Sequence, residues 1–370
     1  MTLYPALITD ALRNVRYPGN GKNLVELGMV EDDIRIDGNR VSFSLIFDRP
    51  TDPFIKSVTK AAEQAILTFV GPDVDIQGNI AVKTRRPQVV KPANPLPGVK
   101  NIVAVASGKG GVGKSTVAAN LAVALAAEGY KVGLLDADIF GPSVPKIFGL
   151  EDTQLYMRHV EGRGDLIIPA EKFGVKMLSI GFVVDRNSAV LWRGSMASNA
   201  LKQLIEQADW GELDYFLIDM PPGTSDIHLT LVQTLGITGA VVVSTPQQIA
   251  LADVRKAVSM FTGDKVNVPI LGIVENMAWF TPLKHPDERY YIFGNGGAAR
   301  LADELKVPLL AQIPLVAAVG DHNDDGIPFA ADGQADPVTA SAFMHLAHSV
   351  IDAVDTRNAT LPPTTKVEMK

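Results

Sequence analysis

The sequence predicts an α/β protein in which a mostly parallel sheet with helices on both faces is preceded by a small α+β domain. Beyond about residue 99, nearly continuous runs of Val, Ile and Leu alternate with helix-forming stretches, as in parallel strands buried on both faces. The earlier residues instead contain a strand with alternating apolar positions. We therefore expect a small domain over 1–85, a linker over 86–98, an α/β domain over 99–355 and a polar, disordered tail over 356–370.

The expected small domain has the order helix, strands, helix, strand. A strand over 40–47 is indicated because Val41, Phe43, Leu45 and Phe47 alternate onto one face, and Asp52 can cap the helix that follows. The expected elements are a helix over 6–15, a possible strand over 24–30, strands over 34–36 and 40–47 joined by a turn at 37–39, a helix over 53–69 and a strand over 74–82.

The linker is recognised by its prolines, Pro87, Pro92, Pro95 and Pro97, which oppose helix and central strand and favour an extended tether. In the α/β domain that follows, ligands are expected at the carboxyl ends of the strands. The expected strands are 103–106, 131–135, 175–180, 215–218, 239–245, 270–274 and 309–313, with helices over 118–127, 195–208 and 335–354.

A glycine-rich loop joins the first of these strands to the first helix. Gly108, Gly113, Lys114 and Ser115 fit the phosphate-loop pattern G-x-x-x-x-G-K-[ST]. The glycines let backbone N–H groups point at phosphate oxygens, and the helix presents its positive end to the same charge. Lys114 can reach the β- and γ-phosphates, and the Ser115 hydroxyl can bind Mg²⁺. The predicted nucleotide-binding residues of this loop are Gly108, Lys109, Gly110, Gly111, Val112, Gly113, Lys114, Ser115 and Thr116.

Carboxylates follow two other strands. Asp219 precedes Pro221-Pro222-Gly223 and can hold Mg²⁺ through water, while Gly223 offers a backbone amide that can sense the γ-phosphate. Asp136 and Asp138 can divide labour between metal support and activation of the attacking water, although this pattern alone is more often a turn. His228 can be an acid or base, but positioning of a helix is the interpretation we favour.

Composition excludes several classes of function. Without cysteine, the chain has no disulfide, no thiolate chemistry and no cluster held by its own thiolates. A net charge of −7 argues against unspecific binding to nucleic acid or anionic membrane. No apolar run approaches the ~18 residues of a membrane span. The first residues lack the pattern of a secretory signal, so we expect a cytoplasmic protein.

The loop Gly108–Ser115, with a lysine directly after its first glycine, resembles the deviant phosphate loop of the SIMIBI-class ATPases. This resemblance implies an ATPase that forms a homodimer, in which Lys109 reaches the partner's nucleotide. It also implies that Asn276 hydrogen-bonds adenine, which suits an amide that both donates and accepts.

Further segments resemble the Mrp/ApbC family of iron–sulfur carriers. They are Trp192-Arg-Gly-Ser-Met-Ala-Ser-Asn199, Asp219-Met-Pro-Pro-Gly-Thr224 and Val274-Glu-Asn-Met277, together with Val25–Val30 of a small iron–sulfur-assembly domain. Residues 139–143 after Asp138 resemble the first switch of this family. The resemblance assigns water activation to Asp138 and metal support to Asp136, so that the implied catalytic residues are Lys109, Lys114 and Asp138 and the metal residues are Ser115, Asp136 and Asp219.

The chain departs from this family where typical members carry a C-x-x-C pair, because residues 278–288 contain no cysteine, and neither does Arg49-Pro-Thr-Asp-Pro53. Three interpretations stay open: a metal at His285 with Asp287 or Glu288, a partner that supplies thiolates, and an ATP-driven switch or scaffold with a non-cluster client. A positioning ATPase on membrane or DNA lacks support, since residues 335–354 contain no Lys or Arg. A nucleotide-bound module without turnover is a further alternative.

Overall fold

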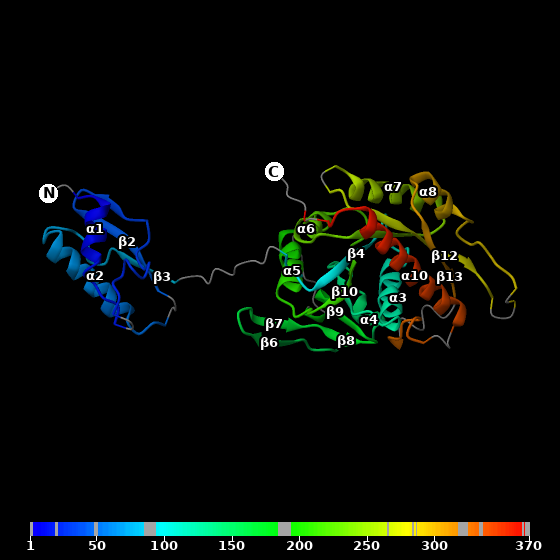
Figure 1. Cartoon of the computed structure of the whole chain (residues 1–370), viewed down its shortest axis with the longest axis horizontal. Coiled ribbons are helices and arrows are strands. Elements are labelled where there is room, and N and C mark those ends of the chain that lie inside the picture. The colour runs from blue at the N-terminus through cyan, green and yellow to red at the C-terminus, as the bar shows by residue number, and fades with distance from the viewer. Residues whose placement is uncertain are drawn as a thin grey trace. The chain divides into compact units, whose positions relative to one another are not determined.

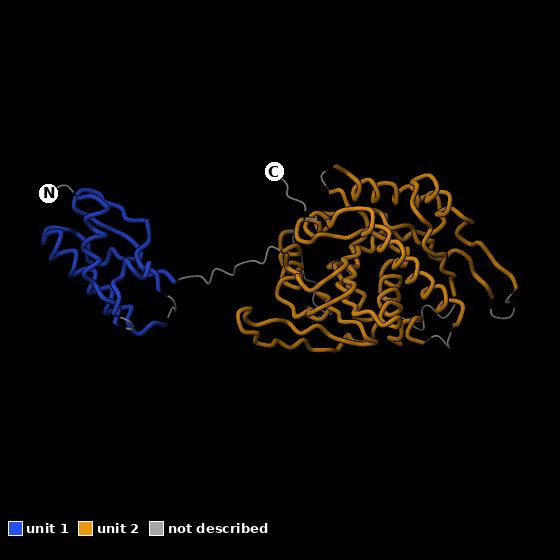
Figure 2. Tube along the Cα trace, viewed as in Figure 1, with its two compact units in different colours: residues 1–91 blue, residues 92–370 orange. Residues whose placement is uncertain are grey.

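The computed structural model describes residues 3–18, 21–47, 51–84, 94–183, 194–264, 266–282, 285, 287–316, 325–332, 336–364 and 366. It divides into two compact units, residues 1–91 and 92–370 (Figure 2). The boundary between the units lies within the stretch predicted as a linker. Among the described residues, no helix combines the length and apolar character needed to cross a membrane.

In the described part of the first unit, a three-stranded sheet is accompanied by two helices (Figure 1). Its strands lie in the order β1-β2-β3, with β1 antiparallel and β3 parallel to β2. Val58, Ala62, Ala65 and Ile66 form the buried stripe of α2, at the spacing of a helix face. The elements are α1 (Pro5–Leu12), β1 (Arg35–Asp37), β2 (Arg40–Phe47), α2 (Ile55–Phe69) and β3 (Ile80–Thr84).

Two strands expected in this unit were misplaced. Residues 24–28 form turns, because Asn23 Oδ1 accepts a hydrogen bond from the Glu26 N–H at 2.8 Å and Gly28 has a φ of 59°, and of the expected strand Val30 alone forms a β-bridge, with Leu45. The strand expected over 74–82 begins only at Ile80, after Gly78 with a φ of 74°. Local turn chemistry therefore prevailed over apolar composition at both places.

The second unit has an eight-stranded sheet in the order β13-β12-β11-β4-β10-β5-β9-β8, in which only β8 pairs antiparallel. This confirms the predicted fold class. Its strands are β4 (Val99–Ser107), β5 (Val132–Asp136), β8 (Ala170–Lys172), β9 (Val175–Ser179), β10 (Leu213–Asp219), β11 (Gly239–Ser244), β12 (Ile270–Phe280) and β13 (Leu309–Leu315).

The helices cover both faces of the sheet (Figure 1). Alternate residues of the central strand β4 show this: Val103 and Val105 pack with α3 and α10, whereas Ile102, Ala104 and Ala106 pack with α5 and α6. The helices are α3 (Lys114–Ala127), α4 (Val144–Ile147), α5 (Gly194–Glu206), α6 (Asp226–Thr234), α7 (Gln248–Thr262), α8 (Gly297–Leu305) and α10 (Pro337–Thr360).

Two features of this unit differ from expectation. A hairpin of β6 (Tyr156–Val160) and β7 (Gly164–Ile168) was not predicted, since its exposed first strand lacks an apolar alternation. The predicted start of the polar tail at residue 356 is wrong, because α10 continues to Thr360. The Arg357 guanidinium then donates hydrogen bonds to the Pro362 carbonyl and the Thr364 hydroxyl, at 2.6 and 2.7 Å, which ties down the residues after the helix.

Candidate functional site

The phosphate loop connects β4 to α3 at the carboxyl edge of the sheet. Gly111 and Gly113 have φ values of 81° and 79°, which favour glycine, and Gly113 directly precedes the first residue of α3. At Gly108 a Cβ atom would come within 2.3 Å of the Asp253 carbonyl carbon in α7. Glycine at 108 therefore allows a close approach of α7, and the glycines at 111 and 113 allow the turn itself.

Asn276 supports this loop from β12. Its Nδ2 donates to the Val112 carbonyl at 2.8 Å, and a Cβ on Gly113 would lie 2.3 Å from the same nitrogen. Regular pairing of β12 ends here, since Met277 has a φ of 55°. Asn276 is 7% exposed. The predicted contact with adenine stays a prediction, and in this structure the amide nitrogen is committed to the loop.

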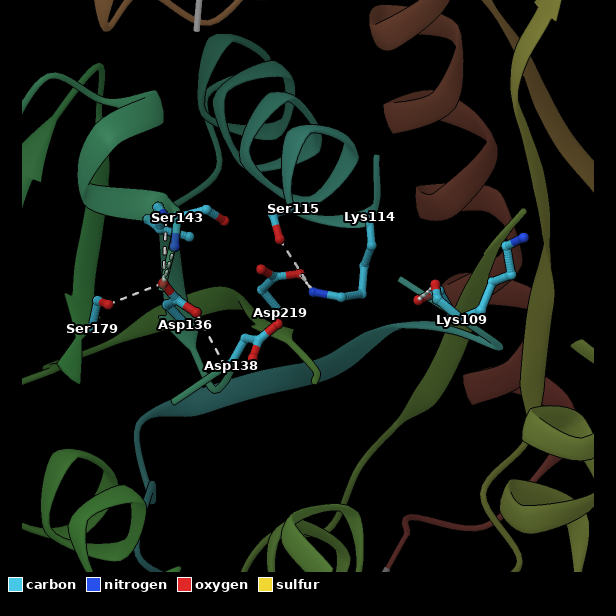
Figure 3. A network of polar contacts seen from close by, with 10 residues as sticks. Lys109, Lys114, Ser115, Asp136, Asp138, Ser143, Ser179 and Asp219 are labelled. Carbon is cyan, nitrogen blue, oxygen red and sulfur yellow. Dashed lines mark hydrogen bonds and ion pairs between the residues drawn. The ribbon is translucent and has the colours of Figure 1, made fainter. Parts of the chain in front are cut away.

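A buried ion pair joins the phosphate loop to β10. Lys114 Nζ lies 2.5 Å from Asp219 Oδ1 and donates to Ser115 Oγ at 3.2 Å (Figure 3). Lys114 is 6% exposed and Asp219 is fully buried. Among the described residues, Asp219 Oδ2 has no hydrogen-bond partner. A buried carboxylate oxygen left without a donor is costly. Because Lys114 Nζ contacts both this carboxylate and the Ser115 hydroxyl, the arrangement fits a hard cation such as Mg²⁺.

Asp136, at the end of β5, is instead saturated by protein donors (Figure 3). Its Oδ1 accepts from the Asp138 N–H at 3.1 Å. Its Oδ2 accepts from the Ser143 N–H, the Val144 N–H and the Ser179 hydroxyl, at 3.1, 3.2 and 2.9 Å. Burial, and then the charge of Asp219, raises the pKa of Asp136, while the Ser179 hydrogen bond opposes that rise. The metal role of Asp136 stays a prediction, and the contacts here hold the loop 138–144.

The loop 138–144 and the phosphate loop line a pocket of about 460 Å³. Half-buried Asp138 lines it, and burial is the main cause that raises the pKa of this carboxyl group. The sequence analysis assigned no ligand-binding role to some lining residues, namely Ser107, Ser143, Lys146, Ile147 and Pro222. Ser143 and Lys146 stand one helical turn apart just after Asp138, and that spacing was a usable signal.

Lys109 and Gly223 were both predicted to contact nucleotide phosphates, and the structure gives each a different environment. Lys109 lines the pocket, but in Figure 3 its side chain points away from the Lys114–Asp219 pair. The Gly223 N–H donates to the Ser107 carbonyl at 3.1 Å, so in this structure the amide is not directed at a ligand.

His228 acts on a helix end. It is 1% exposed, and its Nδ1 accepts from the Ser225 N–H at 3.1 Å, at the start of α6. Burial lowers the pKa of His228 to about 4, which keeps the ring neutral at pH 7. A neutral ring that accepts a backbone N–H positions the helix, in agreement with the interpretation favoured from the sequence.

The segment that follows Asn276 forms an arm without cysteine. Phe280 and Tyr290 exchange two backbone hydrogen bonds of 2.8 Å, and the Arg289 guanidinium lies 4.5 Å from the Trp279 ring. His285 pairs with Glu288 at 3.3 Å. Within the described part of the chain, no group of three His, Asp or Glu side chains is placed to hold a metal ion, so the proposed metal at His285 has no support. Trp192, Arg193, Arg49 and Lys284 lie outside the described residues.

The strand–loop–helix at Gly108–Thr116, with Asp219 beside it on a parallel sheet, defines a P-loop NTPase. A family model described as "NUBPL iron-transfer P-loop NTPase" matches residues 98–351, and one described as "Iron-sulfur cluster assembly protein" matches residues 6–76. The chain therefore belongs to the iron-transfer P-loop NTPase family, the family that the sequence resembles, as a member without the C-x-x-C motif.

Individual relatives agree with this assignment. The iron–sulfur cluster carrier protein of Synechocystis sp. is 40% identical over 352 residues, which span 94% of this chain and 98% of the relative. That of Escherichia coli K12 is 41% identical over 326 residues, 87% of this chain and 85% of the relative. A solved nucleotide-binding protein from Archaeoglobus fulgidus in complex with ADP is 38% identical, with a TM-score of 0.56 over 67% of this chain and 94% of the other.

Proposed function

We propose that this chain is a magnesium-dependent, ATP-binding and ATP-hydrolysing switch protein that works as a cytoplasmic homodimer in iron–sulfur cluster assembly. The observation that carries the proposal is the buried Lys114–Asp219 pair beneath the phosphate loop, with Asp219 Oδ2 unpartnered among the described residues. The ADP complex of the Archaeoglobus fulgidus relative supports the nucleotide class. The names of the relatives support the link to cluster assembly.

Each residue of the site has a defined task in this proposal. Lys114 and the N–H groups of residues 110–116 bind the β- and γ-phosphates, and Asn276 contacts adenine. Ser115 and Asp219 hold Mg²⁺, with Asp136 behind them, and the bound ion supplies neutralisation of phosphate charge. Asp138 orients the attacking water and accepts its proton as the bond between the γ-phosphorus and the ADP oxygen breaks. Lys109, whose side chain points away from the Lys114–Asp219 pair, reaches across the dimer to the partner's nucleotide.

Lys114→Ala tests the nucleotide site. The variant should lose ATP binding and turnover, because Lys109, the other charged side chain of the loop, points away from the Lys114–Asp219 pair and does not replace the lost ammonium group. The control for loss of one positive charge is Lys131→Ala. Lys131 is exposed and directly precedes β5, at the end of that strand away from the phosphate loop. Isothermal titration with Mg·ATP and a phosphate-release assay measure both. Unchanged turnover in a folded Lys114→Ala protein would rule out the proposed site.

The cargo requires a separate test, because the chain has no cysteine thiolate. We propose that partner proteins supply the cluster ligands. Anaerobically purified protein should contain little iron and sulfide alone, and both should appear in complexes with copurifying partners. Iron and sulfide absent from every complex would favour the alternative, an ATP-driven scaffold with a non-cluster client. A stoichiometric cluster on the isolated chain would contradict both.

A further inference from the structure

A third lysine faces the phosphate pocket from α4. Lys146 lines the pocket with Lys109 and Lys114, and Asp138 is the acidic residue among the lining side chains. Lys146 is exposed, whereas its neighbours Pro145 and Ile147 are buried. The helix therefore turns its apolar side into the core and presents this ammonium group at the surface of the pocket.

The position of α4 is fixed at both ends. At the start, the N–H groups of Ser143 and Val144 donate to the buried Asp136 carboxylate at 3.1 and 3.2 Å. At the end, Lys172 Nζ donates to the Phe148 carbonyl at 2.6 Å. These contacts hold a four-residue helix that would not be stable alone. Lys146 is thus carried by an anchored element, and not by a loose loop.

Ser143 gives an independent indication that this face meets a polar ligand. Its hydroxyl oxygen is buried and has no hydrogen-bond partner among the described residues. Ser143 is the residue directly before α4, three positions from Lys146, and both residues line the pocket. A buried hydroxyl next to a lysine is suited to oxygens of a phosphate or of its hydration shell.

We propose that Lys146 binds the terminal phosphate of ATP, which makes it a further nucleotide-binding residue and lets α4 distinguish ATP from ADP. This rests on the proposed function, in which Asp138 faces the water that attacks the γ-phosphate. Asp138 and Lys146 belong to the same loop and helix after β5, so Lys146 lies on the γ-phosphate side of the site. The terminal phosphate of ATP concentrates negative charge there, and this charge leaves with the phosphate after hydrolysis, so ADP offers Lys146 no equivalent partner.

The test compares two nucleotides on the full-length chain. We titrate wild type, Lys146→Gln and Lys146→Arg with Mg·ADP and with a magnesium complex of a non-hydrolysable ATP analogue, by isothermal titration calorimetry. Lys146→Gln should bind the ATP analogue about tenfold more weakly and ADP within about twofold of wild type. Lys146→Arg should retain most of the affinity, and Lys131→Gln is the charge-matched control. Thermal unfolding of the ligand-free variants verifies that α4 remains packed.

The outcomes separate the two proposals. Unchanged affinity for the ATP analogue in folded Lys146→Gln, or an equal loss for both nucleotides, overturns the terminal-phosphate contact and leaves the proposed function intact. Failure of the wild-type chain to bind either nucleotide overturns both. Loss confined to the ATP analogue, with recovery in Lys146→Arg, supports the contact.

Discussion

Strands β5 and β10 lie side by side in the central sheet and end in aspartates, Asp136 and Asp219, that are partners in the strand register. Both side chains are fully buried, yet their surroundings differ (Figure 3). Asp136 accepts hydrogen bonds from four protein donors. Asp219 has one oxygen on Lys114 and the other without a partner among the described residues. The same residue type at equivalent strand ends thus holds a loop in one case, and in the other keeps one buried carboxylate oxygen without a donor among the described residues.

The largest effect is expected at the end of β10. Asp219→Ala leaves the buried Lys114 ammonium without its carboxylate partner, which costs about 3 kcal/mol of unfolding free energy. It also removes a proposed magnesium residue, so turnover should fall at least about a hundredfold. Urea denaturation measures the first effect. The second is checked by Mg·ADP, which should raise the melting temperature of wild type and not of the variant. A variant with the wild-type magnesium response would contradict the assignment of Asp219.

A different loss is expected at the end of β5. Asp136→Asn replaces one acceptor oxygen by a donor, so buried N–H groups of the loop lose their partner at a cost of about 2 kcal/mol. Hydrogen exchange over residues 138–144 should become faster, while ADP binding at the phosphate loop persists. If the variant instead loses its magnesium dependence and keeps its exchange protection, Asp136 supports the metal as the sequence resemblance implies.

Ser179→Ala sharpens the comparison with a smaller change. The substitution removes one donor to Asp136 Oδ2 and leaves its two backbone donors in place, so about 1 kcal/mol is expected. Ser198→Ala, which removes a hydroxyl pair with Thr230 between α5 and α6, is the matched control. Exchange over 138–144 should rise for Ser179→Ala only. Equal behaviour of the two variants would show that Ser179 does not position the loop.

The two strand ends also show what the sequence can predict. Most strands of the central sheet, the phosphate loop and the aspartates that end β5 and β10 could be predicted, because apolar runs and glycine spacing are local signals. The use of each aspartate was not, since it depends on contacts between distant residues. Ser179 is 43 positions from Asp136, and Asn276 is 164 positions from Val112, whose carbonyl it binds. Which carboxylate oxygens remain without a hydrogen-bond donor therefore depends on how the loop folds against them.

The smallest effect at neutral pH is expected at His228, on the helix that follows the β10 loop. Its pKa is about 4 in the folded chain and about 6.5 when unfolded, so between these values the unfolded chain binds the extra proton. The stability that this residue contributes is complete above pH 6.5 and is lost as the pH falls, by at most about 1.4 kcal/mol per pH unit. His228→Asn keeps an acceptor for the Ser225 N–H, with His345→Asn on the exposed side of α10 as the control. Urea denaturation from pH 7 to 4.5 should show that the free energy of unfolding falls less steeply for His228→Asn than for wild type. Identical slopes would mean that protonation of the buried His228 ring does not contribute to the acid sensitivity of the fold.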